Sequence, residues 1–141
     1  MNNKILNRCR DLSIALLEKE PHGILPTHCS FFIYKSKIIK ISRNARKTTP
    51  RNMLNPKISR DGIDISKDKF QCSEFVGLQF LKNTSNVPFS QLSVINTRID
   101  RNGDFANSCP CNSCGSLLAF LNIKSKNIYY TNNRGDFEVF R

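Results

Sequence analysis

The sequence predicts a layered α/β domain built on a mixed β-sheet. Segments with the apolar spacing of a helix alternate along the chain with short runs rich in Phe, Ile, Val and Tyr. The expected order is helix, two strands, a long loop, helix, strand, helix and two strands, and such alternation is typical of layered α/β proteins. With 141 residues the chain has the length of one domain, residues 1–141, with room for a real hydrophobic core.

Each expected element has its own signal. The apolar spacing of residues 4–20 predicts a helix that stops at Pro21 and Gly23, which are poor helix formers. Two strands around a turn near Lys35–Lys37 account for the apolar stretch "HCSFFIYKSKIIKIS". Two further helices are expected, and the second of them follows Pro110; their ranges are residues 70–83 and 111–123. The remaining strands are expected at residues 89–100, 127–132 and 136–140.

Residues 43–69 read as a long basic loop, because they lack periodicity and are interrupted by Pro50, Pro56 and Gly62. The whole chain has a net charge of +11, and residues 35–69 carry +8 of it, from eleven Lys and Arg against three Asp. Such a field favours polyanionic partners such as nucleotides or nucleic acid. The alternative interpretation is a basic, solvated loop with no ligand.

No stretch of the sequence reaches the 18 or more consecutive apolar residues that a membrane span needs. The N-terminus "MNNKILNRCRDLSIALLEKE" carries charges throughout and lacks the apolar core of a signal peptide. We therefore expect a cytoplasmic protein without membrane contact, in a compartment where thiols stay reduced. Six cysteines in that setting indicate metal binding or catalysis before disulfides.

Three of the six cysteines lie close together in "NSCPCNSCGSLL": Cys109, Cys111 and Cys114. A structural zinc site would need a second paired Cys/His element, and the chain has none. A thioredoxin-like pair would follow the first strand of its fold, whereas this one follows the third expected strand. Both interpretations remain open, and each lacks one of its requirements.

A better partner for this stretch is "QCSEF", which begins the helix expected at residues 70–83. Cys72-Ser73-Glu74 and Pro110-Cys111-Asn112-Ser113-Cys114 together match the motif pair of zinc deaminases, in which Cys can be the first ligand. Three thiolates leave one open position on zinc, where a water becomes a usable nucleophile. Glu74 lies two residues after the first ligand, where a carboxylate can transfer protons without binding the metal.

At these residues the chain resembles the cytidine/deoxycytidylate deaminase superfamily, over roughly residues 25 to 137. The resemblance implies a three-layer α/β/α fold with a mixed sheet of about five strands. It also implies one Zn²⁺ per chain, held by Cys72, Cys111 and Cys114, with Glu74 as the proton shuttle. Asn44 matches the substrate-binding Asn of the family; Arg46 and Ser73 are further candidates for substrate binding. Oligomers are common in the superfamily, so a homo-oligomer is expected.

The three-thiolate site raises a question of charge. Zn²⁺ with three thiolates has a net charge of −1, which opposes ionisation of a bound water. Free-cytidine deaminases often carry an Arg directly after the Glu, but here that position is Phe75. We therefore expect an Arg from elsewhere to offset the thiolates, and the candidates are Arg98, Arg46 and Arg134.

The expected function is hydrolytic deamination of a cytosine-type base. The basic loop between Asn44 and Cys72 favours a phosphate-bearing substrate, either a nucleotide of the CMP/dCMP kind or single-stranded nucleic acid. Two alternatives remain. The first is a deaminase of free cytidine or deoxycytidine, because Cys72 resembles the first zinc ligand of that group. The second is a non-catalytic zinc fold that binds nucleic acid or protein.

Overall fold

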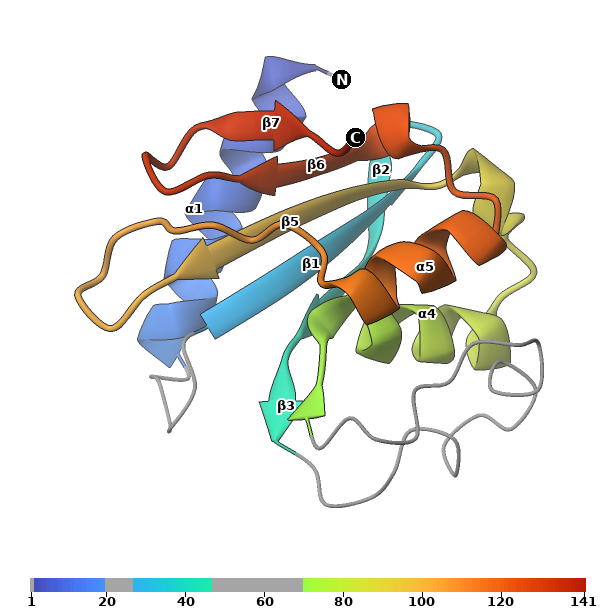
Figure 1. Cartoon of the computed structure of the whole chain (residues 1–141), viewed down its shortest axis with the longest axis horizontal. Helices are drawn as coiled ribbons and strands as arrows, with labels where there is room; N and C mark the ends of the chain where they lie inside the picture. The colour runs from blue at the N-terminus through green and yellow to red at the C-terminus, as the bar shows by residue number, and fades with distance from the viewer. Residues whose placement is uncertain (1, 20–26, 47–69) are drawn as a thin grey trace.

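A five-stranded mixed sheet with helices on both faces forms the body of the molecule (Figure 1). The computed structural model describes residues 2–19, 27–46 and 70–141. The sheet has the strand order β2-β1-β5-β6-β7. The predicted α/β class and mixed sheet are therefore confirmed. No helix within the described ranges combines the length and the hydropathy of a membrane span.

The strands follow the expected order. They are β1 (Thr27–Tyr34), β2 (Lys37–Arg43), β5 (Ser93–Ile99), β6 (Ile128–Thr131) and β7 (Phe137–Val139). β5 and β6 are parallel, because the helix α5 (Asn112–Phe120) connects them as a crossover, and the other neighbours in this sheet are antiparallel. The other helices are α1 (Asn3–Lys19) and α4 (Ser73–Thr84).

Alternation along β1 and β5 divides the core into two clusters, one on each face of the sheet. Figure 1 shows α1 behind the sheet, with α4 and α5 together on its other side. The cluster against α1 contains Leu6, Cys9, Cys29, Phe31, Ile33 and Ile95. The cluster under α4 and α5 contains Phe32, Phe75, Leu78, Leu81, Leu92, Val94, Leu117, Leu118, Ile123 and Ile128. Both clusters consist of buried residues, so the sheet is the middle of three layers.

Gly77 sets how closely α4 packs on the sheet. A Cβ at this position would lie 2.0 Å from Cε2 of Phe32 and 2.8 Å from Oγ of Ser42. Any side chain would therefore push the helix away from β1 and β2. Since α4 begins next to Cys72, this contact also fixes the height of the candidate metal ligand above the sheet.

The structure differs from the sequence prediction in two places. The strand expected at residues 89–100 begins only at Ser93, because Phe89–Gln91 form a 3₁₀ turn after Pro88. In addition, β3 (Ala45–Arg46) pairs with β4 (Phe70–Gln71) in a separate two-stranded ladder. This pairing joins residues far apart in sequence, so local periodicity does not reveal it. Residues 47–69, the rest of the expected basic loop, lie outside the described residues.

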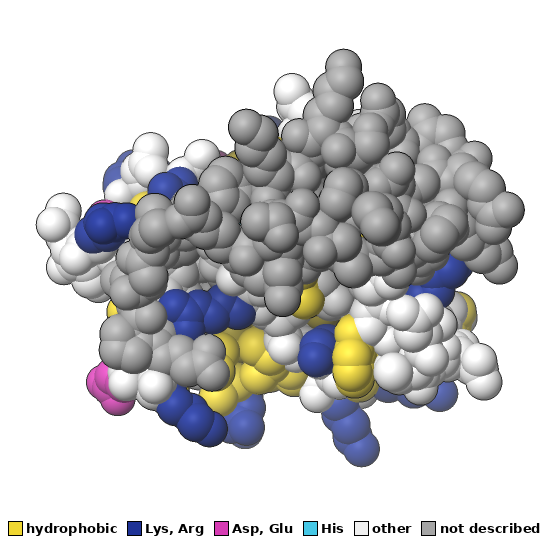
Figure 2. Space-filling view, turned by 90° about the horizontal axis from the view of Figure 1, so that it is seen from below, with side chains coloured by type: hydrophobic (Ala, Val, Ile, Leu, Met, Phe, Trp, Pro, Cys, Tyr) yellow, Lys and Arg dark blue, Asp and Glu magenta, His cyan; other side chains and the backbone are white. Residues whose placement is uncertain are grey.

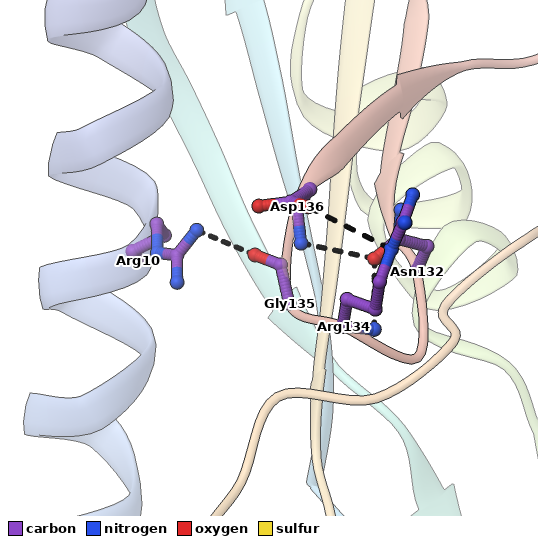
Figure 3. A network of polar contacts seen from close by, with 5 residues as sticks. All are labelled: Arg10, Asn132, Arg134, Gly135 and Asp136. Carbon is purple, nitrogen blue, oxygen red and sulfur yellow. Dashed lines mark hydrogen bonds and ion pairs between the residues drawn. The ribbon is translucent and has the colours of Figure 1, made fainter.

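Arg10 ties α1 to two loops at the edge of the sheet. Its Nη1 donates a hydrogen bond to the carbonyl oxygen of Gly135 at 2.5 Å, in the turn between β6 and β7 (Figure 3). The guanidinium carbon also lies 4.8 Å from the ring centroid of Phe105 and 5.8 Å from that of Phe137. Phe105 belongs to the segment that leads from β5 to Pro110, so Arg10 helps to fix the approach to α5.

Candidate metal centre and adjoining pocket

Three cysteine sulfurs form a cluster between the starts of α4 and α5. The Sγ atoms of Cys72, Cys111 and Cys114 all lie within 4.8 Å of one another, and those of Cys72 and Cys111 are 3.9 Å apart. Tetrahedral zinc with Zn–S bonds of about 2.3 Å places its sulfur ligands roughly 3.8 Å apart. The three cysteines are thus positioned to hold one metal ion, as the spacing of the two motifs predicts.

The two helix starts present these thiols. Cys72 is the N-cap of α4 and Cys111 is the N-cap of α5, and both have an extended backbone conformation. The N–H of Cys114, in the first turn of α5, donates to Sγ of Cys111 at 3.5 Å. The positive end of the helix dipole favours negative charge at both places. The local structure therefore favours thiolates as metal ligands.

Contacts among the clustered thiols, in contrast, favour the protonated forms of Cys72 and Cys114. The pKa of Cys72 is raised to about 11, first because Cys111 hydrogen-bonds to it, and further by burial and the nearby Glu74. The pKa of Cys114 is also raised well above its usual range, by hydrogen bonds with Cys111 and Cys72 and by burial. A cation bound among the sulfurs would take the place of these protons.

Glu74 is buried beside the cluster, with only 1% of its surface exposed. Its Oε1 accepts a hydrogen bond from the Ser73 hydroxyl and its Oε2 accepts one from the Asn96 amide, each at 3.2 Å. Ser30 completes a ring of contacts, at 2.7 Å from both the Ser73 hydroxyl and Oδ1 of Asn96. These donors hold the carboxylate in one orientation at the wall of the site.

A pocket of about 270 Å³ opens next to the cluster and to Glu74. It is lined by His28, Asn44, Cys72, Glu74, Arg98, Asn107, Cys109 and Cys111. The Asn44 side chain is fixed at this wall, because its Oδ1 accepts a hydrogen bond from the His28 backbone N–H at 3.0 Å. The β3–β4 ladder, which pairs Ala45 with Gln71, brings the segments carrying Asn44 and Cys72 together.

The predicted site residues differ in where they lie relative to the pocket. Cys72, Cys111 and Glu74 line the pocket together with Asn44 and Arg98, while Cys114 completes the sulfur cluster from a buried position. Ser73 is fully buried, and its hydroxyl contacts Ser30 and Glu74.

The other two arginine candidates are placed differently. Arg134 lies in the turn between β6 and β7, where its side chain is 84% exposed and 3.9 Å from the Asp136 carboxylate. It is not among the residues that line the pocket. The backbone of Arg46 forms part of β3, but its side chain lies outside the described part of the structure. Arg98 is therefore the arginine that the described structure brings to the pocket.

Sequence reasoning missed Asn96, Ser30 and His28, which surround Glu74 and the pocket. All three lie in β1 or β5, where the sequence pattern predicts only a strand. A signal was present: Ser30 and Asn96 are polar residues two positions from Phe32 and Val94, which face the core. A polar side chain on a core-facing row indicates a buried hydrogen-bond network.

The resemblance to deaminases rests on the Cys72-Ser73-Glu74 and Pro110-Cys111-Asn112-Ser113-Cys114 motifs. No protein-family model, curated protein or solved structure matches the chain.

Proposed function

We propose that this protein is a zinc-dependent deaminase that converts a cytosine-type base to the corresponding uracil-type base and ammonia. The observation that carries the proposal is the position of Glu74. Its carboxylate is buried, lines the same pocket as Cys72 and Cys111, and lies outside the set of sulfur ligands. A metal site with a purely structural role has no need of an oriented carboxylate at an adjoining pocket.

The donor set fits zinc. Three cysteine sulfurs within 4.8 Å of one another suit Zn²⁺, and two of them, Cys72 and Cys111, also line the adjoining pocket. Bound there, zinc would supply the activation of the water that attacks C4 of the base.

Glu74 would transfer the protons of the reaction. The carboxylate would take one proton from the attacking water and deliver it to N3 of the ring. It would then carry the remaining proton, from the hydroxyl added at C4, to the amine, which leaves as ammonia. One water is consumed for each ammonia released. The hydrogen bonds from Ser73 and Asn96 orient the carboxylate, and each of its oxygens keeps a further lone pair for this task.

Arg98 is proposed to offset the net negative charge of a zinc–trithiolate site. It lines the same pocket as two of the thiols, and Phe75, the residue after Glu74, is buried and apolar. A positive charge near the thiolates favours both metal-bound thiolate and ionisation of water.

The proposed substrate carries a phosphate. The chain has a net charge of +11, and Lys and Arg side chains predominate over acidic ones on the face shown in Figure 2. Asn44, held against the pocket wall by His28, is proposed to hydrogen-bond the sugar or the base. Arg46 is proposed to assist from the adjacent strand β3.

Ammonia release tests this proposal directly. Zinc-loaded protein is incubated with cytidine, deoxycytidine, dCMP, dCTP and single-stranded DNA or RNA, with Glu74→Gln as the matched variant. We expect ammonia from at least one phosphate-bearing substrate, and a rate about 10²–10⁴-fold lower for Glu74→Gln. Ammonia only from the free nucleosides would support the nucleoside alternative. Bound zinc with no ammonia from any substrate would refute the enzyme and favour the binding module.

A further inference from the structure

A polar row on the sheet leads from the core to the open end of the pocket. On the face under α4 and α5, three successive cross-strand pairs join β1 and β5: Phe32 with Val94, Ser30 with Asn96, and His28 with Arg98. The first pair belongs to the hydrophobic core. In the second pair, Asn96 donates a hydrogen bond to Glu74, and Ser30 contacts the Ser73 hydroxyl, which also donates to Glu74. The third pair lines the pocket. The row therefore places a basic pair one step beyond the groups that hold Glu74.

The two members of this pair have hydrogen-bonding capacity that the described structure does not use. Nε2 of His28 is buried and has no hydrogen-bond partner in the described part of the chain. No described acidic side chain forms an ion pair with Arg98, which is half-buried. Buried polar groups without partners are costly, and at a pocket wall they indicate a ligand that supplies the missing contact.

We propose that His28 and Arg98 bind the phosphate group of a free mononucleotide. This inference rests on the proposed deaminase function and assigns its substrate class. The planar guanidinium offers N–H donors to two phosphate oxygens, and Nε2 of His28 can donate to a third. The pocket volume of about 270 Å³ gives room for about one nucleotide unit.

The surroundings of the pair are compatible with an anion. Asn44 lies beside His28 and adds an amide group to the same wall. Glu74 is the acidic residue among the lining residues, and its oxygens already accept hydrogen bonds from Ser73 and Asn96. Asp100, two residues after Arg98, accepts hydrogen bonds from the backbone of the turn that follows β5. Both carboxylates therefore already accept hydrogen bonds from groups of the protein.

The test is calorimetric binding to the zinc-loaded Glu74→Gln protein, which prevents turnover. The ligands are dCMP, deoxycytidine, ribose 5-phosphate and a trinucleotide with a central deoxycytidine. His28→Phe keeps the ring and removes its nitrogens; Arg98→Lys keeps the positive charge near the thiolates and removes the planar fork. Arg8→Lys, at an exposed position on α1, is the matched control.

We expect dCMP to bind roughly tenfold or more tightly than deoxycytidine, and each pocket variant to reduce that ratio to about threefold or less. Arg8→Lys should leave the ratio unchanged, and deoxycytidine should bind all variants alike. An unchanged ratio in Arg98→Lys and His28→Phe would overturn the proposal, and Arg98→Lys decides alone if His28→Phe does not fold.

The remaining ligands separate this inference from the function on which it rests. If neither dCMP nor deoxycytidine binds, the deaminase proposal fails. In that case, binding of ribose 5-phosphate that depends on Arg98 would still support the phosphate site. If ribose 5-phosphate does not bind either, the phosphate site is overturned as well. A trinucleotide that binds more tightly than dCMP would overturn the assignment to a free mononucleotide.

Discussion

Replacing Asn96 by Ala should destabilise the protein and release Glu74 from its fixed orientation. Asn96 is fully buried and makes three side-chain contacts. Its Nδ2 donates to Glu74 and to the carbonyl oxygen of Ser108, each at 3.2 Å, and its Oδ1 accepts from Ser30 at 2.7 Å. The substitution leaves all three partners without this contact in a site that water reaches poorly.

The size of the effect follows from these contacts. A neutral hydrogen bond contributes about 1 kcal/mol and one to a charged group about 1.5–3 kcal/mol. Because two of the three contacts are long, we expect a loss of about 3 kcal/mol in the free energy of unfolding, or about 10 °C in Tm for a chain of this length. A double-mutant cycle with Glu74→Ala should give a coupling of about 1–2 kcal/mol.

Urea unfolding of the zinc-loaded protein, followed by circular dichroism, measures both quantities. Asn102→Ala, at an exposed position in the turn after β5, is the control and should change stability by less than about 0.5 kcal/mol. If Asn96→Ala is as mild as this control, or if its effect adds independently to that of Glu74→Ala, Asn96 does not hold the carboxylate.

Three further predictions concern the framework. Gly77→Ala should cost about 1–3 kcal/mol in urea unfolding, because its Cβ would overlap the Phe32 ring. Arg10→Met should lower Tm and increase amide hydrogen exchange around Phe105, since it removes the contacts to that ring and to the β6–β7 turn. Burial raises the pKa of Cys29 to about 11, so folding favours the neutral thiol. The free energy of unfolding should therefore fall between pH 9 and 11, and fall less in Cys29→Val.

Most of the framework was predictable because it depends on local patterns. An apolar stretch rich in Phe, Ile and Tyr placed β1 and β2, and helical spacing placed α1, α4 and α5 within a few residues. The β3–β4 ladder was not predictable, because its partners lie on either side of a long non-periodic segment. The late start of β5 reflects Pro88, whose preference for a turn outweighed the apolar run around it.

The candidate site divides in a similar way. Cys72, Cys111 and Cys114 were identifiable because metal ligands at the starts of helices leave a fixed spacing in the sequence. Asn96 and His28 leave no such spacing, because their roles depend on cross-strand register, which a single sequence does not give. Choosing Arg98 over Arg134 likewise required knowing which strand end reaches the pocket.

X-ray absorption at the zinc edge tests whether this chain holds the proposed three-thiolate zinc with one open position. We expect one zinc per chain with three sulfur neighbours at about 2.3 Å and one lighter atom at about 2.0 Å. Cys109 also lines the pocket, so a fourth sulfur is a real alternative. Four sulfur neighbours would make the site a closed structural one and refute the catalytic zinc, and so would a protein that binds no zinc.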